Sequence, residues 1–339
     1  MPFPRSACAV ALAAMLATVG CSSSAPELSS GGAAVPPPPI AEVVSFGDSW
    51  TDAGTFGFLY GTADGGSWAQ LLAGRYGADQ EPNRLVERAE DGSVLEASVG
   101  GLNYAEGGAV VAPLTDDPGD TPRAVTAQLA AFLDERGSFE PDQLITVWAG
   151  GNDILAELAG AGDEDRATRF ATGELTGTEL AQAALDVVDA AHREAALVAD
   201  MLDAGARRVA VLNVIDQGIT AQGPGIEAGG NALAGALTTT FNRALAEALP
   251  DDARVHMVDV AGLFAAVEAD PAAYGYEVVD GDACTNGDAH CGSDAWVSPD
   301  AARTYAFAGY GHFTTVTREL IAGLVHDEAA KTWGLRPRG

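Results

Sequence analysis

Basic residues are scarce in this chain of 339 residues. It has 18 Lys and Arg against 48 Asp and Glu, which gives a formal net charge of −30. A protein that binds nucleic acid or an anionic membrane surface needs a basic footprint, so both are poor partners for this chain. The excess of acid predicts instead a well-solvated surface that suits salty surroundings.

Long apolar runs are also lacking. The N-terminal run over residues 9–19 is too short to span a bilayer, and it follows a single basic residue, Arg5. It ends at Gly20-Cys21, which resembles a bacterial lipoprotein signal over residues 1–20, with Cys21 acylated as the first mature residue. Simple secretion with cleavage nearby is the alternative. The serines after Cys21 resemble those of lipoproteins sent to the outer membrane or cell surface. Residues 21–40, rich in Ser, Gly and Pro, form a tether.

Only four cysteines and five histidines are present. Cys8 lies inside the signal and Cys21 is the expected lipid site, so Cys284 and Cys291 remain. An exported protein meets an oxidising compartment, and these two are therefore predicted to close a small disulfide loop. Zinc is the alternative because His290 adjoins Cys291, but two cysteines and one histidine lack the paired spacing of a metal site. No metal or organic cofactor is expected.

The chain shows no internal repeat, and no second linker follows residue 40. We therefore expect one domain over residues 41–330 and a loose tail over 331–339. Short apolar strands alternate with helices of ten or more residues, which predicts an α/β fold: three α/β/α layers around a mainly parallel sheet. The strands are expected at 43–46, 143–149, 208–214 and 254–260, and the main helices at 122–137, 177–205, 229–249 and 314–327.

Polar residues follow three apolar segments. Gly47-Asp48-Ser49 follows the first strand, residues 103–108 (NYAEGG) form a glycine-rich turn, and residues 150–153 (GGND) follow a later strand. The carboxyl ends of parallel strands meet at one edge of a sheet, where open α/β sheets bind their ligands. Acyl transfer needs a nucleophile, a base and donors for the oxyanion. We interpret Ser49 as the nucleophile.

The base is chosen among five histidines. His192 and His326 lie in helices, His256 lies in a strand, and His290 lies in the cysteine loop, where structural roles are simplest. His312 remains, in a glycine-flexed loop before the last helix.

These blocks resemble those of the SGNH, or GDSL, hydrolase family. FGDSWTDAG is similar to the serine block, GGLNYAEGGA to the glycine block, GGND to the G-x-N-D block and HFTT to the histidine block. Their order resembles that of esterase domains in bacterial autotransporters. The resemblance implies a flavodoxin-like sheet, Ser49 as nucleophile, His312 as base, and an oxyanion hole made by Ser49, Gly107 and Asn152. The G-x-S-x-G elbow of α/β-hydrolases is absent.

One position departs from the family pattern. The family has an acid three residues before the histidine, and this chain has Gly309 there. Three hypotheses follow: a backbone carbonyl holds the ring in a Ser-His dyad; Asp300 or Asp294 acts as a substitute acid; or the protein is a weakened or inactive relative. Asp48, Asp52 and Asp153 are interpreted as structural.

The resulting hypothesis is an envelope lipoprotein that hydrolyses small-molecule or lipid carboxylic esters. The alternatives are a lipase for longer acyl chains, a polysaccharide deacetylase, or a non-catalytic surface lipoprotein that keeps the fold.

Overall fold

The centre of the computed structural model is a parallel sheet in the order β1-β5-β6-β7. Its strands are β1 (Glu42–Gly47), β5 (Gln143–Trp148), β6 (Val209–Leu212) and β7 (Val255–Val258). Every residue of β5 and β6 is buried, which is typical of parallel strands covered on both faces. The apolar runs of the sequence therefore form the central strands, as predicted.

The segment around Asn103 extends this sheet beyond β1. Ser45 donates its N–H to the carbonyl of Leu102 at 2.9 Å, and Tyr104 donates its N–H to the carbonyl of Ser45 at 2.8 Å. Asn103 thus forms a parallel bridge with Ser45, on the edge of β1 away from β5. The order of the segment, β1, β5, β6 and β7 is that of a flavodoxin-like sheet.

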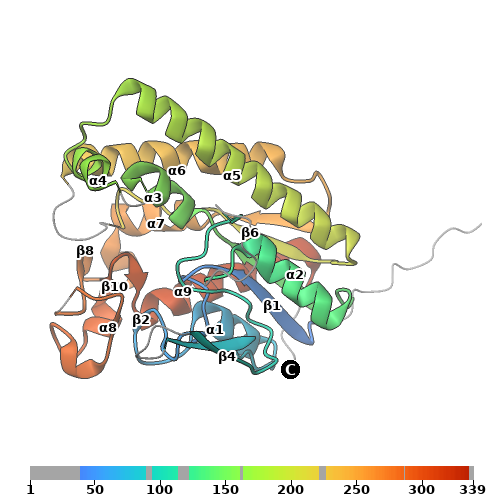
Figure 1. Ribbon diagram of the computed structural model, residues 1–339. Coiled ribbons are helices and arrows are strands. Elements are labelled where there is room, and N and C mark those ends of the chain that lie inside the picture. The colour runs from blue at the N-terminus through green and yellow to red at the C-terminus, as the bar shows by residue number, and fades with distance from the viewer. Residues whose placement is uncertain are drawn as a thin grey trace, which may run out of the picture. The chain divides into compact units, whose positions relative to one another are not determined.

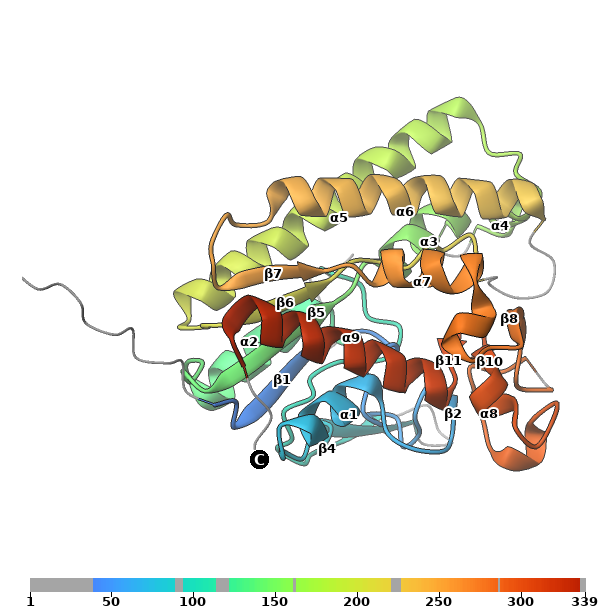
Figure 2. The ribbon, with the colours of Figure 1, turned by 180° about the vertical axis from the view of Figure 1, so that it is seen from behind.

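Helices cover both faces of the sheet and complete three layers (Figures 1 and 2). Helix α1 (Trp68–Arg75) packs against α9 (Thr315–Trp333) on one face, and α5 (Gly177–Asp203) packs against α6 (Ala228–Ala248) on the other. Helix α2 (Val125–Arg136) contacts both β1 and α5. The predicted α/β/α class is confirmed.

Smaller elements lie between these helices and strands. The remaining helices are α3 (Gly151–Ala159), α4 (Glu164–Ala171), α7 (Val260–Ala269), α8 (Ala301–Thr304) and the 3-10 turns η1 (Pro271–Tyr274) and η2 (Ser293–Ala295). The remaining strands are β2 (Gly61–Thr62), β3 (Arg84–Arg88), β4 (Val94–Ser98), β8 (Val278–Asp282), β9 (His290–Cys291), β10 (Tyr305–Gly309) and β11 (His312–Phe313).

The C-terminal third contains more strand than the sequence suggests. Strands β8, β10 and β11 form a second sheet in the order β11-β10-β8, and β2 pairs with β9. The sequence predicts a long loop here, because strands of two to five residues are too short to show periodicity. These pairings bring the cysteine loop and residue 312 next to residues 61–62.

The last helix is longer than expected. Helix α9 continues to Trp333, whose Nε1–H donates to the carbonyl of Ala253 at 2.9 Å, and Leu335 is buried. The prediction of a loose tail from residue 331 is therefore wrong for residues 331–335, because the indole and Leu335 pack against the fold.

The structure describes residues 39–88, 94–113, 122–160, 163–220, 227–285 and 287–335. The predicted signal, Cys21 and nearly all of the tether lie outside these residues. In the described part of the chain, no helix combines the length and the apolar character needed to cross a bilayer.

Candidate active site

A tight turn after β1 presents Ser49. Strand β1 ends at Gly47, which has a φ of +152°, and a Cβ there would lie 2.3 Å from the carbonyl oxygen of Trp148 at the end of β5. Only glycine allows this close approach. The Asp48 carboxylate accepts the N–H of Trp50 at 3.0 Å and so closes the turn around Ser49, which is half-buried.

Ser49 and His312 lie together although 263 positions separate them in the chain. The Ser49 Oγ and the His312 Nε2 are 2.8 Å apart. The other ring nitrogen, Nδ1, lies 3.2 Å from the carbonyl oxygen of Gly309. Burial lowers the pKa of His312 to about 4, against the opposing effect of the carbonyls of Gly309 and Tyr310. At neutral pH the imidazole is therefore uncharged and ready to accept a proton.

A two-residue hairpin between β10 and β11 sets this geometry. Gly309 pairs with His312, and the two residues between them have positive φ values, +48° at Tyr310 and +65° at Gly311. Positive φ at both central positions is what a type I′ turn requires. The Trp50 Nε1–H donates to the carbonyl of Gly311 at 3.1 Å, which ties the hairpin to the serine turn.

The loop that the expected disulfide closes lies against Gly309. Cys284 and Cys291 are bonded, with their Cα atoms 5.9 Å apart. A Cβ on Gly309 would lie 2.4 Å from the carbonyl oxygen of Asp288 and 2.9 Å from that of Gly287, both within the loop that the disulfide closes. The backbone of this loop thus occupies the space that an acidic side chain at position 309 would need.

Neither proposed substitute acid reaches the histidine. Asp300 is exposed and accepts a hydrogen bond from the Ser298 hydroxyl at 2.8 Å, and Asp294 is exposed. In the described part of the chain, neither carboxylate bonds to His312. This corrects the hypothesis that Asp300 or Asp294 orients the ring, because the Gly309 carbonyl already occupies Nδ1.

Three of the other four histidines have structural partners, and the fourth, His192 on α5, is exposed. His256 pairs with Glu328, His326 pairs with Asp327, and His290 Nδ1 lies 2.7 Å from the carbonyl of Leu59.

The predicted oxyanion donor Gly107 needs correction. Its N–H donates to the Asp52 carboxylate at 2.9 Å, so it is not free. The next residue, Gly108, is exposed and has a φ of +86°. Within the described residues no partner is seen for the N–H of Gly108 or for that of Ser49. The sequence could not separate the two adjacent glycines, since only the contact with Asp52 distinguishes them.

Asn152 lies at the start of α3, and its side chain faces both the serine turn after β1 and the segment that follows the glycine-rich turn. Its side-chain amide donates to the carbonyl of Ala109 at 2.9 Å and approaches the Asp48 carboxylate at 3.5 Å. Its neighbour Asp153 accepts the N–H of Val111 at 3.0 Å, which supports the structural interpretation of that residue. The three polar blocks of the sequence are thereby brought to one edge of the sheet.

Four buried carboxyl groups surround this edge. Burial raises the pKa of Asp48 to about 7, and that of Asp52 and Asp153 to about 6. Burial also raises the pKa of Glu194 on α5, whose carboxyl oxygens find no partner among the described residues, and the charges of Asp153 and Asp48 add to the effect. The sequence does not single out Glu194, because an acid within a long helix is ordinarily exposed.

The geometry agrees with what a comparison with protein families finds. Residues 43–323 match the family described as GDSL-like Lipase/Acylhydrolase. The chain belongs to this family. The match runs from β1 into α9, and membership supports hydrolysis of esters in general. A comparison with curated proteins gave no match.

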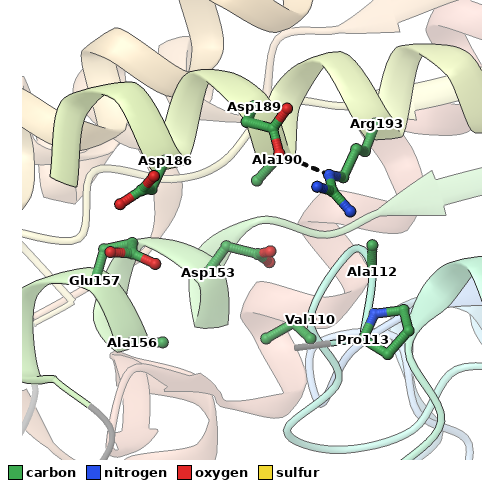
Figure 3. Close-up of a pocket in the computed structure, with 10 residues that line it drawn as sticks. All are labelled: Val110, Ala112, Pro113, Asp153, Ala156, Glu157, Asp186, Asp189, Ala190 and Arg193. Carbon is green, nitrogen blue, oxygen red and sulfur yellow. Dashed lines mark hydrogen bonds and ion pairs between the residues drawn. The ribbon is translucent and has the colours of Figure 1, made fainter. Parts of the chain in front are cut away.

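A cavity of ≈ 250 Å³ lies beside the glycine block of this acylhydrolase (Figure 3). It is lined on one side by Val110, Ala112 and Pro113, and on the other by α3 and α5. Its polar lining is mostly acidic: Asp153, Glu157, Asp186 and Asp189, with Arg193 paired to Asp189. Anionic ligands would be repelled from this cavity. Among the described residues, no cluster of His, Cys, Asp and Glu fits a metal ion.

Proposed function

We propose that the protein hydrolyses carboxylic esters through an acyl-enzyme on Ser49, with His312 as general base. The observation that carries this proposal is the contact of 2.8 Å between Ser49 Oγ and His312 Nε2, with Nδ1 facing the Gly309 carbonyl. A carbonyl can only accept a hydrogen bond, so Nδ1 carries the proton. Nε2 is then the acceptor for the serine proton, which is the tautomer that a general base needs.

The reaction follows from this arrangement. Ser49 Oγ attacks the carbonyl carbon of the ester while its proton moves to Nε2 of His312. The bond to the alcohol oxygen breaks, and the departing alcohol takes the proton from Nε2. Water then attacks the acyl-enzyme and gives a proton to the same nitrogen. That proton returns to Ser49 Oγ as the carboxylic acid leaves.

The tetrahedral intermediates need donors for their oxyanion. The N–H groups of Ser49 and Gly108 and the side-chain amide of Asn152 are the best candidates. Asn152 is anchored through one hydrogen bond to Ala109, and its contact with Asp48 is long at 3.5 Å. A substrate oxyanion would replace this weak contact with a stronger one.

A Ser-His dyad stabilises the protonated histidine less strongly than a triad does. A carboxylate stabilises the imidazolium with a full charge, whereas the Gly309 carbonyl offers only a dipole. The carbonyl still selects the correct tautomer, so we expect slower turnover and not complete loss of activity.

The test is hydrolysis of a series of p-nitrophenyl esters from acetate to long acyl chains. We expect Ser49→Ala and His312→Ala to lower kcat by about 10³-fold or more, while Ser98→Ala, an exposed serine on β4, retains wild-type rates. Equal slow hydrolysis by wild type and Ser49→Ala would favour the non-catalytic alternative. Faster release of acetate from an acetylated polysaccharide than from any simple ester would favour the deacetylase.

The location of the enzyme is a separate proposal. We infer from the sequence that Cys21 carries a lipid and holds the domain at the bacterial envelope. Wild-type protein made in a bacterial host should enter the detergent phase on Triton X-114 partitioning, and Cys21→Ser should stay in the aqueous phase. A wild type that stays in the aqueous phase would support simple secretion.

A further inference from the structure

Tyr60 contacts the candidate base. Its ring stacks on the imidazole of His312 with 5.1 Å between ring centroids and 28° between planes. The far end of the same side chain lies on the glycine block, because a Cβ built on Gly107 would lie 2.1 Å from the Tyr60 hydroxyl oxygen. One side chain thus spans the distance between the base and the glycine block of the site.

The backbone around Tyr60 is held on both sides. The carbonyl of Leu59 faces Nδ1 of His290 at 2.7 Å, and Gly61 donates its N–H to the carbonyl of Ala289 at 2.6 Å. Gly61 has a φ of +116°, and a Cβ there would lie 2.1 Å from the carbonyl oxygen of Phe313. Residues 59–61 are therefore fixed between the disulfide loop and the strand that carries His312.

We propose that Tyr60 is a positioning residue for His312. Its ring restricts rotation of the imidazole about the hydrogen bond to Gly309. In a triad, a carboxylate partner would restrict this rotation by its charge and geometry. The contacts of the two ring nitrogens, with the Gly309 carbonyl at 3.2 Å and with Ser49 Oγ at 2.8 Å, do not fix rotation of the ring about the line that joins them. A stacked aromatic face limits that rotation. This inference rests on the proposed role of His312 as base.

The phenol and its neighbours fit this role. Burial raises the pKa of Tyr60 to about 12, and the charges of Asp52 and Asp48 add to the effect, so the hydroxyl stays protonated. The ring of Phe58 contacts the rings of Tyr60 and His290 at tilted angles of 57° and 47°, and it makes no ring contact with His312 in the described structure. Phe58 therefore offers a matched control at the same surface.

The experiment compares Tyr60→Leu, Tyr60→Phe and Phe58→Leu with wild type in ester hydrolysis. We expect Tyr60→Leu to lower kcat by about 10- to 100-fold, the range that misplacing a catalytic group costs, with KM changed less than about threefold. We expect the acid limb of the pH profile to move up toward 6.5 as water reaches the imidazole. Tyr60→Phe should restore both values, because it keeps the ring, and Phe58→Leu should match wild type. Thermal melting of each variant establishes that it is folded.

A second measurement separates this inference from the proposed function. The pKa of His312 is followed by NMR in the Ser49→Ala background, where no turnover is needed, with and without Tyr60→Leu. A higher pKa in Tyr60→Leu than in Tyr60→Phe supports the positioning role even if no ester is hydrolysed. Folded Tyr60→Leu with wild-type kcat and an unchanged His312 pKa would overturn it, and so would an equal loss of kcat in Tyr60→Phe.

Discussion

The residue that replaces the usual family acid is a glycine for a steric reason. Gly309 lies against the backbone of Gly287 and Asp288, at distances that admit no Cβ. Gly309→Asp would raise the rate if the missing acid alone limited catalysis, whereas the structure predicts the opposite. The side chain would push the disulfide loop away and displace the carbonyl that holds His312.

We therefore expect Gly309→Asp to lower both kcat and the free energy of unfolding, the latter by about 1–3 kcal/mol, a typical cost of overpacking. Urea denaturation and ester hydrolysis measure the two effects. Gly74→Ala on α1, where a Cβ meets open space, is the control and should be neutral or slightly stabilising. A faster and equally stable Gly309→Asp variant would show that the disulfide loop moves aside without loss of stability.

Asn152 gives the second prediction at this scale. If its amide binds the oxyanion, Asn152→Ala should lower kcat by about 10²- to 10³-fold with little change in KM, because the interaction strengthens only in the transition state. Steady-state kinetics with a p-nitrophenyl ester measures both constants. A loss confined to KM would instead assign Asn152 to ground-state binding.

The low pKa of His312 predicts the acid limb of the activity. A base must be deprotonated to act, and burial lowers this pKa from an ordinary 6.5 to about 4. We expect kcat/KM to persist down to about pH 5. Burial raises the pKa of Asp48 to about 7, so we expect its titration to contribute a separate inflection. The variant Asp48→Asn should remove that inflection and leave the limb near pH 4. An inflection at 6.5 in both proteins would contradict the expectation.

At the scale of elements, the disulfide loop links two parts of the site. Its backbone lies against Gly309, and its strand β9 pairs with β2, next to Tyr60. Removing the bond should therefore affect catalysis as well as stability.

We expect the double variant Cys284→Ser, Cys291→Ser to lose about 2–3 kcal/mol of unfolding free energy, since the bond joins two residues whose sequence separation is 7. We also expect a fall in kcat. Dithiothreitol should reproduce both effects in wild type and change nothing in the variant. Full activity of the folded double variant would show that packing alone holds the loop.

The whole molecule combines a large negative charge with buried acids. The pKa values of Asp48, Asp52 and Asp153 are raised from 3.8 to between about 6 and 7 in the folded state. The stability that such groups contribute is fully present below pH 4, and it is lost as the pH rises through 6 to 7. His312 acts in the opposite sense, since its lowered pKa makes its contribution disappear as pH falls from 6.5 toward 4.

Three buried acids outweigh the single histidine, and repulsion among the negative surface charges also grows as the pH rises. We therefore expect the free energy of unfolding to fall between pH 5 and pH 8, and added NaCl to recover part of the loss at pH 8 by screening. Urea denaturation at the two pH values, with and without salt, measures this. Asp48→Asn should flatten the dependence. A stability that increases over this range would contradict the expectation.

Local patterns in the sequence determine the fold and the main candidates of the site. Apolar runs predict the central strands, and the polar residues after two of them lead to Ser49 and Asn152. His312 emerges because it lies in a glycine-rich loop while the other histidines lie in helices, a strand or the cysteine loop. These features depend on neighbours in the chain, so the sequence alone is sufficient to find them.

The tertiary structure alone decides what acts on these residues. It places the Gly309 carbonyl, and not Asp300 or Asp294, at Nδ1 of His312, and it stacks Tyr60 on His312. It also binds the N–H of Gly107 to Asp52, while the N–H of Gly108 has no partner among the described residues. Each of these choices is a contact between distant parts of the chain. A hydrogen bond or ring stack forms only when packing brings its two groups within a few ångströms, and spacing along the sequence does not encode that distance.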